Sequence, residues 1–202
     1  MTPRRRQPSE LASQATPLVV LGMALIASNR YISFLDAEVR SLDAAMQPAR
    51  TIAASFLAGP GQQGVPALYT IVLHYWLHWT AWNFDYLRIP AIAFFLTGLF
   101  FLARAAHRFA GSVGASAAIW LGILWPFGFH YGRLAAPYSF VFFLVSGLTF
   151  TYLRFLEENN FKRWSTMTLF GAALLWTSLL GWAVLGCLAI DQALRRRAGG
   201  KS

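Results

Sequence analysis

Charged residues are scarce in this sequence of 202 residues, where Asp, Glu, Lys and Arg together make up only 12%. A soluble domain carries about 25% charged residues, so too little polar material is present to cover a surface that faces water. Apolar residues instead reach 56%, and the mean hydropathy is +0.46. Lipid is the simplest solvent for such a chain, and we therefore predict an all-α integral membrane protein rather than a soluble domain.

Acidic residues are the scarcer of the two charged kinds, because 8 Asp and Glu stand against 17 Lys and Arg, for a net charge of +9. The basic residues lie in short clusters between apolar runs, as the topology signals of membrane proteins do. They form no single solvated patch, which argues against nucleic acid as a partner. Cysteine is nearly absent: Cys187 stands alone and excludes a disulfide within the chain.

Long apolar runs are abundant, and five of them have about the length that a bilayer requires: 17–35, 86–105, 113–131, 137–156 and 164–194. The last run would measure about 46 Å as one helix, well beyond a hydrocarbon core of about 30 Å. Thr177, Ser178 and Gly181 interrupt it. We therefore predict two short antiparallel helices with a turn near 178–181, and a strongly tilted single helix is the alternative. We expect the first run to be a retained helix, since no small-x-small cleavage site of a signal peptide follows it.

A sixth apolar stretch, 65–82, is rich in Trp and Tyr, which mark the boundary between lipid and water. If this stretch does not cross, six spans place 12 of the 17 Lys and Arg residues on the cytoplasmic side. If it crosses, the basic clusters near 104–108, 154–163 and 195–201 move outside, against the positive-inside rule. We therefore predict about six transmembrane helices, with amphipathic helices of the first external loop lying on the outer membrane surface.

The whole chain, 1–202, is then one transmembrane module of the cytoplasmic (inner) membrane of a bacterium, with both termini in the cytoplasm. Residues 1–16 and 195–202 form cytoplasmic tails, and residues 36–85 form the external juxtamembrane segment. Such a loop is far longer than an ordinary connection, and long loops tend to carry function.

Four short segments, taken in order, resemble the GT-C superfamily of glycosyltransferases, and family 39 with its protein mannosyltransferases in particular. ISFLDAEV places Asp36 at the acid that follows the first span of the family, and VPALYTIVLHYW matches its Pro-Leu-Tyr helix. DYLRIPAI supplies Arg88 of its Leu-Arg-Leu-Pro segment, and YGRLAAPYSF matches its Tyr-rich segment after the third span. The resemblance implies transfer of a sugar from a polyprenyl-phosphate donor at the outer face of the membrane.

The sequence also departs from the family. The acid of the fourth segment is replaced by Leu134 and its arginine by Ala136, the Glu of the first by Ala37, and the His of the second by Val65. Family members also have further spans beyond this N-terminal module. Two hypotheses follow: a shortened, catalytically degenerate module that serves as a structural or accessory subunit beside other membrane proteins, or an active glycosyltransferase. The first is favoured.

The resemblance implies a catalytic base at Asp36, with Glu38 as the neighbouring acid, since transfer requires a group that accepts the proton of the acceptor. Asp36 is equally well explained as the cap of the helix that follows it. Arg30, Arg88 and Arg133 all fall near the outer boundary, where they would bind the phosphate of the donor. Snorkelling of these arginines to lipid headgroups is the simpler explanation of their position.

His74 and His78 are spaced i, i+4, which places both on one face of a helix and can support a metal or another ligand. No third ligand is evident, so no metal site is predicted; a divalent metal would be expected only in an active enzyme. Haem or pigment binding by a single histidine stays open. Interfacial histidines bonded near headgroups are the simpler interpretation. The expected partners are membrane lipid, polyprenyl phosphate and other membrane subunits.

Overall fold

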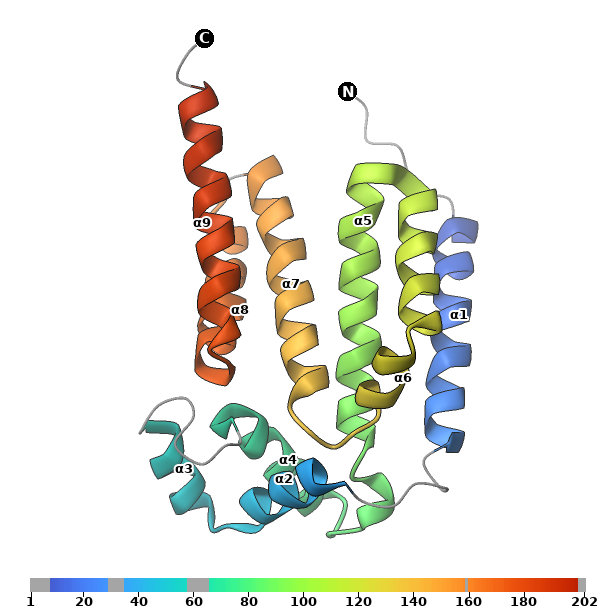
Figure 1. The fold of residues 1–202 in the computed structure, drawn as a ribbon, viewed down its shortest axis with the longest axis vertical. Helices are drawn as coiled ribbons and strands as arrows, with labels where there is room; N and C mark the ends of the chain where they lie inside the picture. Colours follow the sequence, from blue (N-terminus) through green and yellow to red (C-terminus); the bar gives the residue numbers. More distant parts are fainter. Residues whose placement is uncertain (1–7, 29–34, 58–65, 159, 200–202) are drawn as a thin grey trace.

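The computed structural model describes residues 8–28, 35–57, 66–158 and 160–199. Every regular element within these ranges is a helix, which confirms the all-α prediction. Long helices run along the long axis of the molecule, and short helices lie across one end of them (Figure 1). We call this the α2–α4 end; the opposite end, where α1 begins and α9 ends, is the terminal end.

The long elements are α1 (Pro8–Ser28), α5 (Ile89–Leu124), α7 (Tyr138–Glu157), α8 (Phe161–Thr177) and α9 (Leu180–Gly199). Helix α5 is two helices joined by a sharp turn, because Ala110 and Gly111 leave the helical conformation, with φ of −131° and +61°. Its two arms lie antiparallel in Figure 1, so the chain reverses direction at the terminal end. A positive φ is open to glycine at little cost, which explains the residue at the turn.

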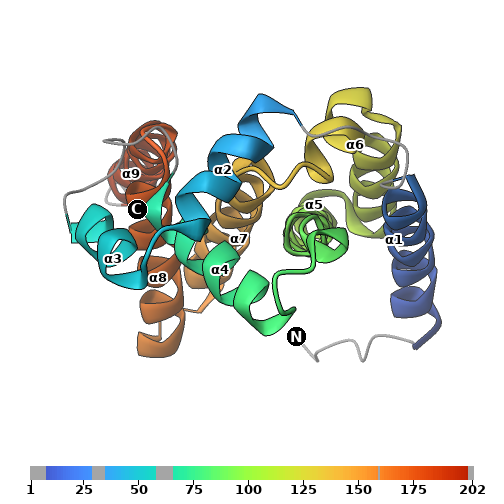
Figure 2. The ribbon, with the colours of Figure 1, turned by 90° about the horizontal axis from the view of Figure 1, so that it is seen from below.

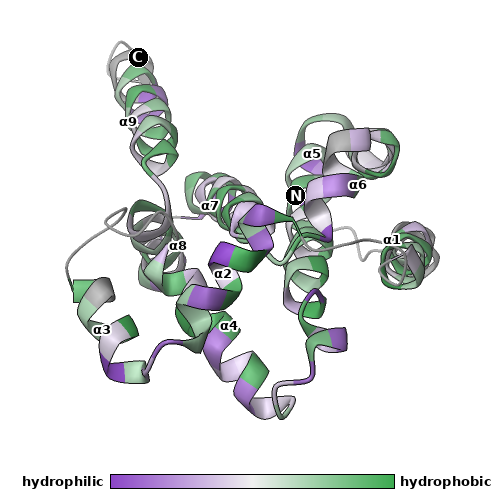
Figure 3. Cartoon of the chain, turned by 60° about the horizontal axis from the view of Figure 1, so that its bottom comes forward, coloured by the Kyte–Doolittle hydropathy of each residue, from purple (hydrophilic) through white to green (hydrophobic). Residues whose placement is uncertain are grey.

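The short elements at the α2–α4 end are α2 (Asp36–Met46), α3 (Ala49–Leu57), α4 (Ala67–Trp79) and the 3-10 turn η2 (Phe84–Tyr86). Seen from below, they cross the ends of the long helices (Figure 2). Several residues of α2 are hydrophilic (Figure 3). The sequence predicted helices in this segment. It did not predict the break at Gln47 and Pro48 between α2 and α3, although a proline cannot continue an α-helix.

Two predicted boundaries have clear outcomes. The run 164–194 is divided as expected, since α8 ends at Thr177 and α9 begins at Leu180. The predicted span 113–131 is wrong at its second end: the arm stops at Leu124, and a separate short helix, α6 (Pro126–Gly132), follows. Pro126 causes this break, because the residue before a proline is driven out of the helical region.

The core has two main parts. The larger joins the α2–α4 end to the long helices, with Tyr69, Leu73 and Leu77 of α4 packed against Phe140, Leu144 and Leu148 of α7 and Leu174 of α8. The smaller joins α1 to the first arm of α5, through Leu21 and Leu25 on one side and Ile92, Phe95 and Leu99 on the other. The transverse helices are thus anchored by their own apolar faces.

Two helical segments are long and apolar enough to cross a membrane: 84–124, with 41 residues, and 138–157, with 20. A shorter apolar helix covers 15–28. Large apolar side chains also face outward on α1, α8 and α9, among them Val20, Met23, Leu169, Trp182 and Ile190. Exposed apolar surface of this extent is typical of contact with lipid or another protein.

Candidate functional site

Glu38 is the most unusual charged residue at the α2–α4 end, because its side chain is completely buried. It stands in the first turn of α2, where its Oε2 accepts a hydrogen bond of 3.3 Å from the backbone N–H of Leu35, the residue that caps the helix. An acid in this position also interacts favourably with the positive end of the helix dipole. A buried carboxylate is stable only when it is paired and hydrogen-bonded.

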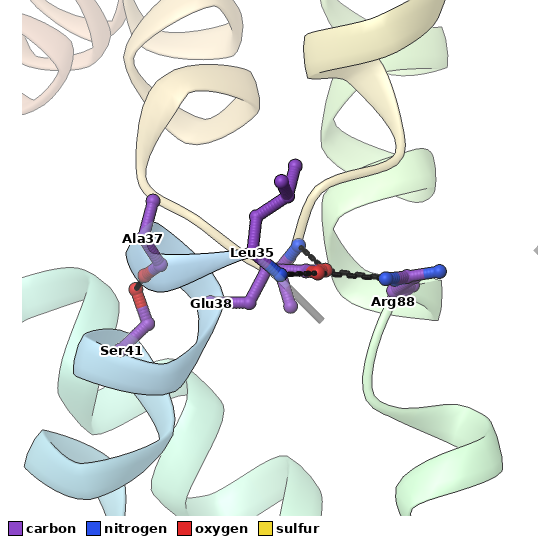
Figure 4. A network of polar contacts seen from close by, with 6 residues as sticks. Leu35, Ala37, Glu38, Ser41 and Arg88 are labelled. Carbon is purple, nitrogen blue, oxygen red and sulfur yellow. Dashed lines mark hydrogen bonds and ion pairs between the residues drawn. The ribbon is translucent and has the colours of Figure 1, made fainter. Parts of the chain in front are cut away.

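Arg88 provides that pair from the start of α5 (Figure 4). Its Nε donates to Oε1 of Glu38 at 2.7 Å, and one terminal nitrogen donates to Oε2 at 2.7 Å. The guanidinium side chain is only 7% exposed. This is the fork-to-fork geometry in which arginine binds a carboxylate most strongly.

The turn between α6 and α7 completes the arrangement. The backbone N–H of Ala135 donates to Oε1 of Glu38 at 2.9 Å, so each oxygen of the carboxylate accepts two hydrogen bonds. Leu134 and Ala136, which flank Ala135 in the sequence, are buried. The backbone of this segment therefore contacts Glu38 directly, between two buried apolar residues.

The electrostatics agree with this geometry. Burial alone would raise the pKa of Glu38, but the hydrogen bonds from Arg88 and Ala135 and the charge of Arg88 outweigh it and hold the pKa below its ordinary value. The pKa of Tyr69 is raised, because its ring is buried and the Glu38 carboxylate is near. Glu38 is thus a stable anion, poorly suited to accept a proton at neutral pH.

Arg133 lies close to this pair but makes different contacts. One terminal nitrogen donates to Oγ of Ser28 at 2.8 Å, and its guanidinium carbon lies 5.0 Å from the ring centre of Phe129. Its Nε is buried and has no hydrogen-bond partner within the described ranges of the chain. Burial and the positive charge of Arg88 lower the pKa of Arg133, and Glu38 offsets part of that effect.

A cavity of about 360 Å³ opens beside Arg133, between α5, α6 and α7. It is lined by Phe95, Trp125, Gly128, Tyr131, Gly132, Tyr138, Ser139 and Phe142. The hydroxyl of Ser139 is occupied by the carbonyl oxygens of Tyr131 and Gly132, at 3.0 and 3.2 Å. The cavity is therefore mainly aromatic.

The other predicted site residues are dispersed. Asp36 is exposed at the first position of α2, two residues before the buried Glu38. The Nδ1 atom of His74 donates to the carbonyl oxygen of Ala45 at 2.7 Å, which ties α4 to α2, whereas His78 is exposed. Arg30 lies outside the described residues.

Within residues 8–28, 35–57, 66–158 and 160–199, no group of three or more His, Cys, Asp or Glu side chains is close enough to hold a metal ion. The hydrogen bond from His74 to the carbonyl oxygen of Ala45 gives that histidine a structural role.

Comparison with known proteins gave no match: no family model, curated protein or solved structure is similar to the chain. The GT-C resemblance therefore depends on the motif residues alone.

Sequence reasoning assigned Glu38 and Arg88 to separate roles and missed that they form a pair. They are 50 residues apart, and no periodicity links them. The amide of Ala135 left no signal at all, because a backbone donor is independent of the side chain.

Proposed function

We propose that the protein is a GT-C-like module of the cytoplasmic membrane, without transfer activity, that acts as a structural or accessory subunit of a membrane complex. In this proposal α1, both arms of α5, α7, α8 and α9 cross the bilayer, and α2, α3 and α4 lie on its outer surface. The distribution of charge supports the orientation: Arg104, Arg108, Arg154, Lys162, Arg163 and Arg195 belong to the terminal end, which would face the cytoplasm.

The saturated Glu38–Arg88 pair is the observation that carries the functional proposal. A catalytic base needs an accessible lone pair, and a phosphate-binding arginine needs donors directed at its ligand. Both oxygens of Glu38 are already occupied, and two nitrogens of the nearly buried Arg88 donate to them. Arg88, which matches the arginine of the family segment, and Glu38, which lies next to the family's acidic positions, therefore support the architecture of the α2–α4 end rather than chemistry there.

The decisive experiment is extraction of the full chain from its native membrane in a mild detergent, followed by mass measurement and a transfer assay. We expect a stable complex with a second membrane protein in fixed stoichiometry, and no transfer of labelled sugar from a polyprenyl phosphate. A chain that migrates alone and transfers sugar would overturn the proposal.

The second candidate, an active transferase, is favoured by one observation: exposed Asp36 and Arg133 lie at the same end as the aromatic cavity. Asp36→Asn and Arg133→Gln are the informative variants, because Asp36 is exposed and neither residue belongs to the buried pair. Loss of a measurable transfer rate in both would establish this candidate. Glu38→Gln is unsuitable, since it also removes a core contact.

The topology has its own test by cysteine labelling in a Cys187→Ser background. Phe161→Cys at the terminal end should react only with reagents that cross the membrane, whereas Asp43→Cys on α2 should react from outside; both positions are exposed in the protein. Labelling of residue 161 from outside would overturn the six-span arrangement.

A further inference from the structure

A second cavity, of about 390 Å³, lies between α5, α7 and α8 at the terminal end. Basic residues line it: Arg154 in the last turn of α7, and Lys162 and Arg163 in the first turn of α8. Its apolar lining consists of Phe101, Phe150 and Phe170, which are half-buried. The cavity thus combines exposed positive charge with an aromatic floor.

The positive charge of this cavity is only partly neutralised. Arg163 pairs with Glu158 at 2.7 Å, and it also donates to the carbonyl oxygen of Arg154 at 2.8 Å. The nearby Glu157 is taken by Arg108, at 2.7 Å. In the described part of the chain, Arg154 and Lys162 have no carboxylate within ion-pair distance. Two net positive charges therefore remain at the rim.

Arg154 and Lys162 differ in how favourably each interacts with the dipole of its own helix. Arg154 stands at the C-terminus of α7, where the helix dipole favours a cation, and its guanidinium lies 5.8 Å from the ring centre of Phe150. Lys162 stands at the N-terminus of α8, where the dipole disfavours a cation and favours an anion. A bound anion would satisfy the lysine and the N-terminus of α8 together.

We propose that this cavity binds the phosphate of an anionic phospholipid headgroup between Arg154 and Lys162. The glycerol and the first acyl carbons then lie against the rings of Phe101, Phe150 and Phe170. A free phosphate gains nothing from an aromatic floor, whereas a lipid is charged at one end and apolar at the other. Basic pockets between transmembrane helices on the cytoplasmic side are a known site type for anionic headgroups. The proposal depends on the six-span topology but not on the absence of transferase activity.

The test is native mass spectrometry of the purified full chain in non-ionic detergent, titrated with phosphatidylglycerol or with phosphatidylcholine. We expect the wild-type protein to retain phosphatidylglycerol in preference to phosphatidylcholine. Combining Arg154→Gln with Lys162→Gln should weaken phosphatidylglycerol binding by about 30-fold, since each cation near the lipid surface contributes roughly 1 kcal/mol. The thermal unfolding midpoint should change little, because both side chains are exposed and the helix dipoles favour Arg154 but disfavour Lys162.

Arg104→Gln is the matched control, since Arg104 lies on α5 at the same end but outside the cavity lining. It should keep the wild-type preference. Equal weakening by the control would show general charge attraction and overturn the site, as would equal retention of the two lipids. Displacement of phosphatidylglycerol by an excess of inorganic phosphate would also overturn the proposal, because the ligand would then be free phosphate.

Discussion

At the α2–α4 end, Arg88 is buried and its guanidinium is matched by a carboxylate with no remaining capacity. At the terminal end, Arg154 and Lys162 are exposed and have no such partner among the residues that the structure describes. Both regions combine basic residues with aromatic surroundings, so composition alone does not separate them. The two regions differ in whether their positive charge is neutralised. A basic residue that is paired with a carboxylate adds rigidity, whereas basic residues without such a pair can attract an anionic ligand. The following substitutions test that contrast.

The largest effect is expected from Glu38→Gln. The amide keeps the size of the side chain but leaves the Arg88 charge buried without its counter-ion, and breaking a buried pair in this way costs about 3–5 kcal/mol. The free energy of unfolding should fall by that amount in a reversible denaturant titration in mixed micelles. Asp36→Asn is the matched control: it makes an equivalent change in the same helical turn at an exposed position, and should alter stability by less than about 0.5 kcal/mol. Equal losses of unfolding free energy in the two variants would show that the burial of Glu38 does not cause the destabilisation.

Acid should weaken the same pair. The pKa of Glu38 is depressed in the folded protein relative to an ordinary value of 4.5, so the unfolded chain binds the proton first as the pH falls. The stabilisation is therefore complete above pH 4.5 and is lost as the pH falls through the lower pKa of the folded state. Measured against pH, the free energy of unfolding should decline more steeply below this point for the wild-type protein than for Glu38→Gln. Parallel curves would contradict the depressed pKa.

Much of the architecture was accessible from sequence because it depends on local signals. The turn between α8 and α9 follows from polar and small residues at 177–181, and the helices of the external segment follow from their spacing of apolar residues. The end of the second α5 arm was misplaced because the apolar run continues past Pro126, and hydropathy outweighed the effect of proline on the preceding residue.

The candidate site was less accessible, for a different physical reason. Sequence singled out Arg88, Glu38 and Arg133, and the structure brings these three together at one end. It did not reveal that Glu38 neutralises Arg88, because a contact across 50 residues depends on how α2 docks on α5. Nor did it separate exposed Asp36 from buried Glu38, since a helical turn places these neighbours on different faces.

The turn between the two arms of α5 at the terminal end requires an unusual backbone conformation at Gly111, and Gly111→Ala tests this requirement. Gly111 has φ of +61° and ψ of −148°, a region that is essentially restricted to glycine. The substitution should reduce the free energy of unfolding by about 1–3 kcal/mol, measured in the same titration. Gly186→Ala is the control, because an added methyl group meets open space at both positions and only the backbone conformation differs. The control should be neutral or stabilising by up to about 1 kcal/mol. A neutral Gly111→Ala would show that the turn relaxes.

The smallest effect is expected from Glu157→Gln, which makes the same chemical change at the terminal end as Glu38→Gln makes at the other. Glu157 pairs with Arg108 at 2.7 Å, the distance that also joins Glu38 to Arg88, but its side chain is 55% exposed. Solvent screens such a pair, and its loss should cost at most about 1 kcal/mol in the same titration. A loss as large as that of Glu38→Gln would mean that distance rather than burial sets the strength of these pairs, and the contrast between the two ends would then fail.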